Sequence, residues 1–191
     1  MAVRLFAAIP LDTGARAYVA TALDALAREG ARARWVSSEN WHVTLAFLGE
    51  VADAGIPAVV TAFRSVVQSS VLGQASLAQS KIKPFSLQLS RIGAFPNLRR
   101  PRVIWVGGRE QDQAFERTAV ALRAAFGVLG FRFDDAATAH VTIGRTNGST
   151  PLRAPQLSAE YSMPVTRLVL FESALGPAGA RYPEREEIIL G

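Results

Sequence analysis

The chain has 191 residues, of which 49% are hydrophobic and 19% charged, a composition typical of a folded globular protein with room for a real core. No apolar run comes near the roughly 18 residues that a transmembrane helix needs, so we expect no membrane association. Cysteine is absent, which excludes disulfides and thiolate chemistry and is typical of a reducing cytoplasm, where we expect the protein. The formal net charge of +5 favours an anionic partner such as RNA, although an arginine-rich composition explains it equally well.

The first half of the chain is expected to begin with a buried strand, whose apolar run is too short for the core of a signal peptide. Cap residues, helical spacing and glycines predict the elements that follow. In chain order these elements are a strand over residues 3–9, a helix from a cap at Asp12 or Thr13 to Gly30, a strand over residues 41–48 closed by Gly49, and a helix from Pro57 to about Ser70. Residues 71–81 are small and polar and show no clear period.

The second half contains more strands, and some of them follow one another directly. The expected elements are strands over residues 85–89, 103–106 and 139–143, an amphipathic helix over residues 115–129 ended by Gly130, a short strand over residues 131–133, a loop or short helix over residues 151–162, and strands over residues 165–171 and 187–190. Turns are expected at residues 95–97 and 176–179. This mixed order favours an α+β fold over a regular parallel sheet.

A repeated tripeptide is the most informative feature of the sequence. His42-Val43-Thr44 recurs as His140-Val-Thr142 about half a chain later, and these are the only two histidines. Each copy follows a helix that ends in glycine and a short connection. We therefore expect one domain over residues 1–191 with two internally duplicated lobes. Each lobe would be a mainly antiparallel sheet with helices on the outside, and the active-site cleft would lie between the lobes.

The repeated tripeptides point to acid–base chemistry on a phosphoester. Side chains alternate along a strand, so His42 and Thr44 share one face, as do His140 and Thr142. Histidine titrates near neutral pH, so a neutral ring can accept a proton while a protonated ring donates one, each transfer being worth roughly 10²–10⁴ in rate. The threonine hydroxyls can donate hydrogen bonds to phosphate oxygens.

Structural, metal-binding and triad roles fit the two histidines less well. A single histidine is usually structural, but two in the same tripeptide are harder to explain that way. No carboxylate flanks either histidine at ligand spacing and cysteine is absent, so we expect no metal. A Ser-His-Asp triad uses one histidine and leaves the second without a role. No phosphate-binding G-x-x-x-x-G-K-[ST] loop is present, and we expect no cofactor.

Taken with their flanking segments, these motifs resemble those of the 2H phosphoesterase superfamily, named for two H-x-[ST]-x motifs. The closer resemblance is to the bacterial and archaeal RNA 2′,3′-cyclic phosphodiesterases, also called 2′-5′ RNA ligases, and it covers nearly the whole chain. The segments that carry it are residues 4–9, 34–36, 39–49, 93–96, 100–105, 139–145 and 171–182. Together they are specific, whereas a single H-x-T would be weak.

The resemblance implies an activity and a set of roles. The family opens a terminal RNA 2′,3′-cyclic phosphate to a 2′-phosphate, without a cofactor, and can run the related transfer backwards to form a 2′-5′ linkage. His42 would be the proton donor to the leaving 3′ oxygen and His140 the proton acceptor that activates water, although the sequence itself does not orient the pair. Thr44 and Thr142 would bind the phosphate, with Arg145 as a further substrate-binding residue.

Some residues depart from the family pattern or from strand parity. The segment before the second motif, residues 132–139, is acidic and lacks the proline usual in the family. By strand alternation Arg145 lies off the His/Thr face unless the strand ends or twists, and by the same parity Phe47 is expected in the core. Trp41 and Tyr182 can stack on a base, but aromatic residues more often serve packing.

We therefore expect a monomeric, metal-independent cyclic phosphodiesterase that acts on RNA ends with a 2′,3′-cyclic phosphate, tRNA fragments among them. Two alternatives stay open at this point. One is a 2H phosphoesterase that acts on a small cyclic nucleotide or on ADP-ribose cyclic phosphate. The other is a non-catalytic RNA-binding protein on the same fold.

Overall fold

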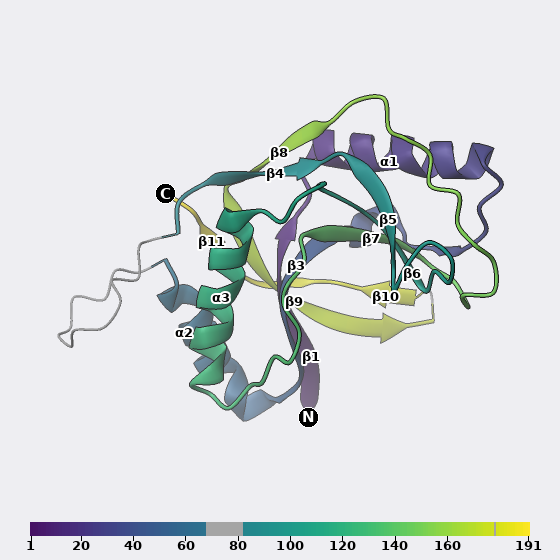
Figure 1. The fold of residues 1–191 in the computed structure, drawn as a ribbon. Helices are drawn as coiled ribbons and strands as arrows, with labels where there is room; N and C mark the ends of the chain where they lie inside the picture. The colour runs from purple at the N-terminus through teal and green to yellow at the C-terminus, as the bar shows by residue number, and fades with distance from the viewer. Residues whose placement is uncertain (68–81, 178) are drawn as a thin grey trace.

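The protein has a mixed α+β architecture built around one large antiparallel sheet (Figure 1). The structure is a computed structural model and describes residues 1–67, 82–177 and 179–191. Within these residues, nine strands form the large sheet, two further strands form a separate small sheet, and three α-helices pack around them. The predicted α+β class is confirmed, and no helix of the described residues is long and apolar enough to cross a membrane.

The element bounds follow the chain from the N-terminus. The helices are α1 (Thr13–Arg28), α2 (Ile56–Ser65) and α3 (Gln113–Gly127). The strands are β1 (Ala2–Pro10), β2 (Arg34–Trp35), β3 (His42–Ala52), β4 (Phe85–Leu89), β5 (Arg91–Phe95), β6 (Val103–Gly107), β7 (His140–Arg145), β8 (Tyr161–Val165), β9 (Arg167–Gly176), β10 (Gly179–Arg181) and β11 (Glu184–Ile189).

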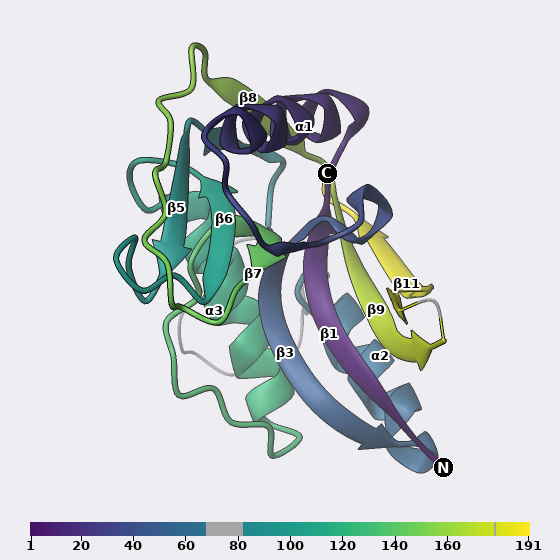
Figure 2. The same cartoon turned by 90° about the vertical axis from the view of Figure 1, so that its right-hand side faces the viewer.

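The large sheet runs in the order β10-β9-β1-β3-β7-β6-β5, with β11 also paired to β9 and β2 also paired to β7. The pairing of β1 with β3 reaches from Ala2 and Ala52 to Pro10 and His42. Figure 2 shows β3, β1 and β9 side by side on one side of β7, with β6 and β5 on its other side. The strand that carries the second His-Val-Thr motif therefore lies in the middle of the sheet, beside the strand that carries the first.

The main core lies on the side of the sheet that α2 and α3 cover, and these two helices pack against each other (Figure 1). Helix α3 buries a stripe at helical spacing, as the sequence predicts: Phe115, Ala119, Leu122 and Phe126. Aspartates cap α1 and α3 in the same way, because the carboxylate of Asp12 accepts from Ala15 N and that of Asp112 from Phe115 N. One apolar cluster runs through both halves of the chain.

Two elements of the sequence prediction are wrong for identifiable reasons. Strand β3 continues through Gly49, which was expected to close it, because Gly49 adopts φ +75° in an irregularity of the pairing with β1. Residues 131–133, expected as a short strand, form none. The ring of Phe133 instead packs beneath the guanidinium of Arg123, whose carbon Cζ lies 5.2 Å from the ring centre.

Further differences concern elements with a weak local signal. The pattern did not predict β2, β5, β8 or β10, and β9 and β11 are longer than expected. The unpredicted strands have only two to five residues, so pairing with other segments defines them more than their own sequence does. Helix α2 ends at Ser65, short of the expected end at about Ser70. Residues 68–81 lie outside the described residues, and they include the last part of that expected helix and the segment 71–81.

Candidate active site

The two His-Val-Thr motifs lie on neighbouring antiparallel strands near the centre of the sheet. Strands β3 and β7 are joined by a single residue pair, Val43 with Val141. The continued register would set His42 opposite Thr142 and Thr44 opposite His140. Farther along, β7 pairs with β2 instead, through Gly144 with Trp35 and Arg145 with Arg34.

The predicted alternation of faces holds at both motifs. On β3, Val43 and Leu45 are fully buried in the main core, whereas the histidine and threonine of that strand are only partly buried. The pattern on β7 is the same. Both His/Thr pairs therefore lie on the face of the sheet opposite α2 and α3, and that face exposes polar groups.

Both imidazole rings are held by the same backbone contact. His42 Nδ1 lies 2.8 Å from the carbonyl oxygen of Asn40, and His140 Nδ1 lies 2.8 Å from that of Thr138. A carbonyl can only accept, so each Nδ1 carries the proton and each Nε2 is left with its lone pair. The two rings are therefore fixed in one tautomer, with Nε2 as the nitrogen available for proton transfer.

Aromatic residues enclose both rings. Around His42, the ring centroids of Phe6 and Phe171 lie at 4.8 and 6.2 Å, and Tyr182 packs edge-on at 5.3 Å. Around His140, Phe95 packs edge-on at 5.0 Å. This apolar surround removes water from the rings and makes a positive charge on them costly.

The pKa values of both histidines are accordingly lowered. Burial lowers the pKa of His42 to about 4, while the hydrogen bond to Asn40 raises it and the charge of His140 lowers it further. Burial also lowers the pKa of His140, where the bond to Thr138 raises it and the charge of Arg145 lowers it. Without a bound anion, both rings are therefore predominantly neutral at pH 7.

A small pocket of about 180 Å³ opens at the motifs. Its lining combines polar groups of both strands with the aromatic surround: Phe6, Val36, Asn40, His42, Thr44, Phe47, Thr142, Arg145, Ser173 and Tyr182. The structure thus brings four of the five predicted site residues to one pocket. The fifth, His140, is not part of that lining, but it lies on the same strand face as Thr142, and its charge acts on His42.

Phe47 is not a core residue, contrary to the parity prediction. Its side chain is 49% exposed and lines the pocket. The register of β3 against β1 passes from Thr44 to Ala46 and leaves Leu45 as an extra, bulged residue. A bulge reverses the alternation of faces beyond it, so Phe47 returns to the side of the motif.

Arg145 reaches the site through the matching irregularity on β7. The register against β6 passes from Thr142 to Gly144 and leaves Ile143 as the extra residue. Gly144 is then buried and the side chain of Arg145 is exposed on the pocket face. Simple alternation placed Arg145 on the wrong face because a one-residue bulge gives no clear signal in the sequence.

The segment before the second motif is held by α3 despite its lack of proline. Arg123 donates to the backbone carbonyls of Leu45 and Asp135, and its guanidinium lies 5.2 Å from the ring centre of Phe133. The carbonyl of Thr138 accepts a hydrogen bond from His140 Nδ1, as the carbonyl of Asn40 does from His42 Nδ1. The unusual segment therefore keeps the second imidazole in a position equivalent to the first.

Several lining residues were not assigned to the site from the sequence. Asn40 contributes its carbonyl to His42, and its side-chain amide donates to the carbonyl of Ala180 at 2.8 Å. Tyr182 lines the pocket, whereas Trp41 is 4% exposed and donates to the carbonyl of Val36, so it is structural. The only sequence signal for Asn40 is its place in a segment of the family resemblance, whereas Tyr182 also has a ring that can stack on a base.

Comparison with known proteins identifies the family. The sequence model of the 2'-5' RNA ligase superfamily matches residues 16–176. The RNA 2',3'-cyclic phosphodiesterase of Methanothermobacter thermautotrophicus is 32% identical to this chain, over 97% of the chain and 98% of its own length. The protein TT0787 of Thermus thermophilus superposes with a TM-score of 0.78 at 26% identity, covering 98% of this chain and 97% of that chain.

A second solved structure extends the comparison to the whole chain. E. coli LigT complexed with 3'-AMP superposes with a TM-score of 0.74 at 25% identity, covering 100% of this chain and 99% of that chain. The fold is that of a 2H phosphoesterase. The chain belongs to the 2'-5' RNA ligase superfamily.

Proposed function

We propose that the protein is an RNA 2′,3′-cyclic phosphodiesterase that opens a terminal cyclic phosphate to a 2′-phosphate. Several relatives that match most of the chain carry that name. The observation that carries the proposal is the matched pair of imidazoles, each with Nδ1 bonded to a carbonyl and Nε2 left for proton transfer. Two such groups beside two threonines supply an acid, a base and phosphate ligands together.

In the proposed reaction, the neutral ring of His140 takes a proton from water as the water oxygen bonds to phosphorus. The bond from phosphorus to the 3′ oxygen breaks, and protonated His42 donates its proton to that oxygen. Thr44 and Thr142 donate hydrogen bonds to the non-bridging oxygens, and Arg145 adds a positive charge beside them. The products are a 2′-phosphate and a free 3′-hydroxyl.

Substrate binding is expected to prepare His42 for its role as proton donor. In the free protein its pKa is about 4, so it is neutral at pH 7. A phosphate anion in the pocket stabilises the protonated ring and raises that pKa. The acid is then charged only when substrate is present, whereas His140 stays neutral to act as the base.

The same groups support a 2′-5′ ligation, which we include in the proposal. A 5′-hydroxyl would take the place of water and lose its proton to His140. Its oxygen would bond to phosphorus as the 3′ oxygen leaves with the proton of His42, which yields a 2′-5′ phosphodiester. Neither direction needs a group beyond the two histidines for proton transfer.

An oligoribonucleotide that ends in a 2′,3′-cyclic phosphate, incubated with the protein and EDTA, tests the proposal. We expect release of a 2′-phosphate end, with a rate at least ~10²-fold lower in each of His42→Ala and His140→Ala. Thr44→Ala should lose activity, while Thr61→Ala, a matched change at an exposed position on α2, should keep it. Binding without turnover would overturn the proposal, and loss of turnover in EDTA would overturn its metal-independent form.

A further inference from the structure

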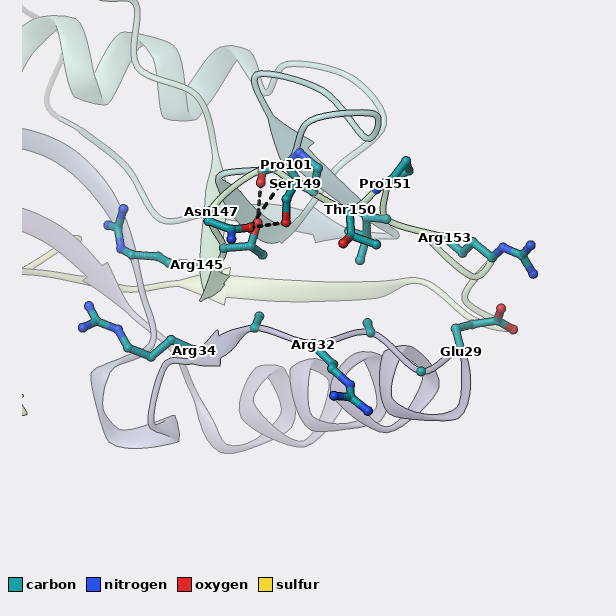
Figure 3. Close-up of a pocket in the computed structure, with 15 residues that line it drawn as sticks. Glu29, Arg32, Arg34, Pro101, Arg145, Asn147, Ser149, Thr150, Pro151 and Arg153 are labelled. Carbon is teal, nitrogen blue, oxygen red and sulfur yellow. Dashed lines mark hydrogen bonds between the residues drawn. The ribbon is translucent and has the colours of Figure 1, made fainter.

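A wide groove opens beside the catalytic pocket and has a different character. Its volume is about 850 Å³, and it runs between the segment that follows α1 and the loop that follows β7 (Figure 3). The charged residues of its lining are four arginines and one glutamate: Arg32, Arg34, Arg145, Arg153 and Glu29. Within the part of the chain that the structure describes, none of these arginines makes an ion pair.

Two of the arginines are cross-strand neighbours. Arg34 on β2 pairs in register with Arg145 on β7, and Figure 3 shows the two side chains extending to the same side. Like charges directly opposite each other on antiparallel strands destabilise a sheet. An anion between them removes that penalty, and the guanidinium fork suits a phosphate. The pair is therefore suited to binding a phosphate.

The groove is continuous with the catalytic pocket. Arg145 lines both, so the groove begins where the reacting phosphate would sit. Glu29 and Arg153 lie at the opposite end of the groove from Arg34 and Arg145 in Figure 3. Their charges offset each other, so the net positive charge is concentrated at the end that Arg34 and Arg145 occupy.

A second hollow also adjoins the pocket, through Asn40 and Tyr182, and it offers the other direction for a substrate chain. The charged residues in its lining are Glu39 and Arg181, so it carries no net charge. The arginine groove carries four positive charges against one negative. Charge complementarity therefore favours the arginine groove for a polyanion.

Backbone hydrogen bonds fix both walls of the groove. In the loop after β7, Thr146 N donates to the carbonyl of Arg102 at 3.0 Å and Leu152 N to that of Leu98 at 2.8 Å. In the facing wall, Ala31 N donates to the carbonyl of Leu26 at 3.0 Å. The arginines project from anchored backbone, so little ordering of the backbone is needed when a strand binds.

We propose that this groove binds the phosphodiester backbone of the RNA strand on the 5′ side of the cyclic phosphate. Arg34 binds the phosphate that precedes the cyclic phosphate, sharing it with Arg145, which also adjoins the reacting phosphate. Arg32 and Arg153 bind the strand farther along. This assignment rests on the proposed function, because it extends the substrate of the same site. It predicts that the enzyme distinguishes an RNA end from a mononucleotide by backbone charge.

The test compares two substrates, uridine 2′,3′-cyclic phosphate and a decaribonucleotide with a 2′,3′-cyclic phosphate end. In Arg32→Gln/Arg153→Gln, we expect the ratio of kcat/KM for the decamer to that for the mononucleotide to fall at least tenfold, through KM. Arg117→Gln, an exposed charge on α3 outside the groove, should keep the wild-type ratio. An unchanged ratio in the double variant would overturn the assignment.

A binding measurement tests the groove independently of turnover. Fluorescence anisotropy with a labelled decamer that ends in a 2′-phosphate should show weaker binding to the double variant. The slope of log Kd against log salt should be shallower by about 0.7 for each arginine removed. Equal affinity and slope in wild type and variant would contradict the groove. A wild type that binds the decamer in this way but turns over neither substrate would refute the proposed function alone.

Discussion

His42 and His140 have the same local geometry but are tuned by different neighbours. Each donates from Nδ1 to the carbonyl two residues earlier, so each presents Nε2 to the site. Burial lowers both pKa values, and the positive charge of Arg145 adds to the effect at His140. When the site is empty, the lowered pKa values keep the histidines neutral at pH 7. A bound anion that raises the pKa of one ring therefore causes a large change in its protonation state.

This tuning predicts an acid-shifted pH profile for kcat/KM. A reaction that needs one ring protonated and the other neutral is fastest between the two pKa values of the free enzyme. Both are lowered from the ordinary histidine value of about 6.5, so the maximum should lie below pH 6.5, and kcat/KM should fall as the pH rises through neutrality. Initial rates from pH 4 to 9 at low substrate concentration measure this.

The corresponding profile of kcat serves as the internal control. Because the bound phosphate anion raises the pKa of the acid, kcat should hold its value to a higher pH than kcat/KM does. A kcat/KM that stays constant between pH 6 and 9 would contradict the assigned acid–base pair.

At the scale of single elements, the decisive feature is the bulge that follows each threonine. It lets a strand present a histidine and a threonine, bury the next two residues, and then return a side chain to the same face. Phe47 and Arg145 occupy this returned position on β3 and β7. One strand thus adds an aromatic surface to the pocket and the other a positive charge.

The bulge on β3 has a measurable consequence for stability. Leu45 is fully buried and Phe47 is 49% exposed, although simple alternation puts both in the core. Leu45→Ala should lower the free energy of unfolding by about 2–5 kcal/mol, whereas Phe47→Ala should lower it by less than about 1 kcal/mol. Urea denaturation of the two variants and the wild type gives the comparison. Similar large losses in both variants would show that Phe47 is packed in the core.

At the scale of the molecule, the two halves of the chain share one sheet and one apolar cluster. Strands β3 and β7 meet through one residue pair, and Arg123 of the second half donates to the carbonyl of Leu45 in the first. The matching caps, bulges and histidine contacts are what an internal duplication would leave. The organisation as a single duplicated domain stays a prediction.

That organisation predicts a single cooperative unfolding transition. Tryptophan fluorescence can follow each half separately, because Trp41 lies in the first half and Trp105 in the second, both buried. The variant Trp35→Phe/Trp105→Phe keeps only Trp41, and Trp35→Phe/Trp41→Phe keeps only Trp105. In each variant, the urea midpoint measured by fluorescence should coincide with the midpoint measured by circular dichroism. Fluorescence and circular dichroism midpoints that differ in either variant would show that the halves unfold separately.

The sequence by itself determined the features that depend on local chain geometry. Strand alternation paired His42 with Thr44 and His140 with Thr142, and helical spacing identified α1 and α3. Only the tertiary structure decided which strands are neighbours, where a bulge reverses the faces, and that Arg34 lies opposite Arg145. Registers between distant segments depend on packing across the whole sheet, which no local period records. The arginine groove beside the two histidines is therefore a property of the fold.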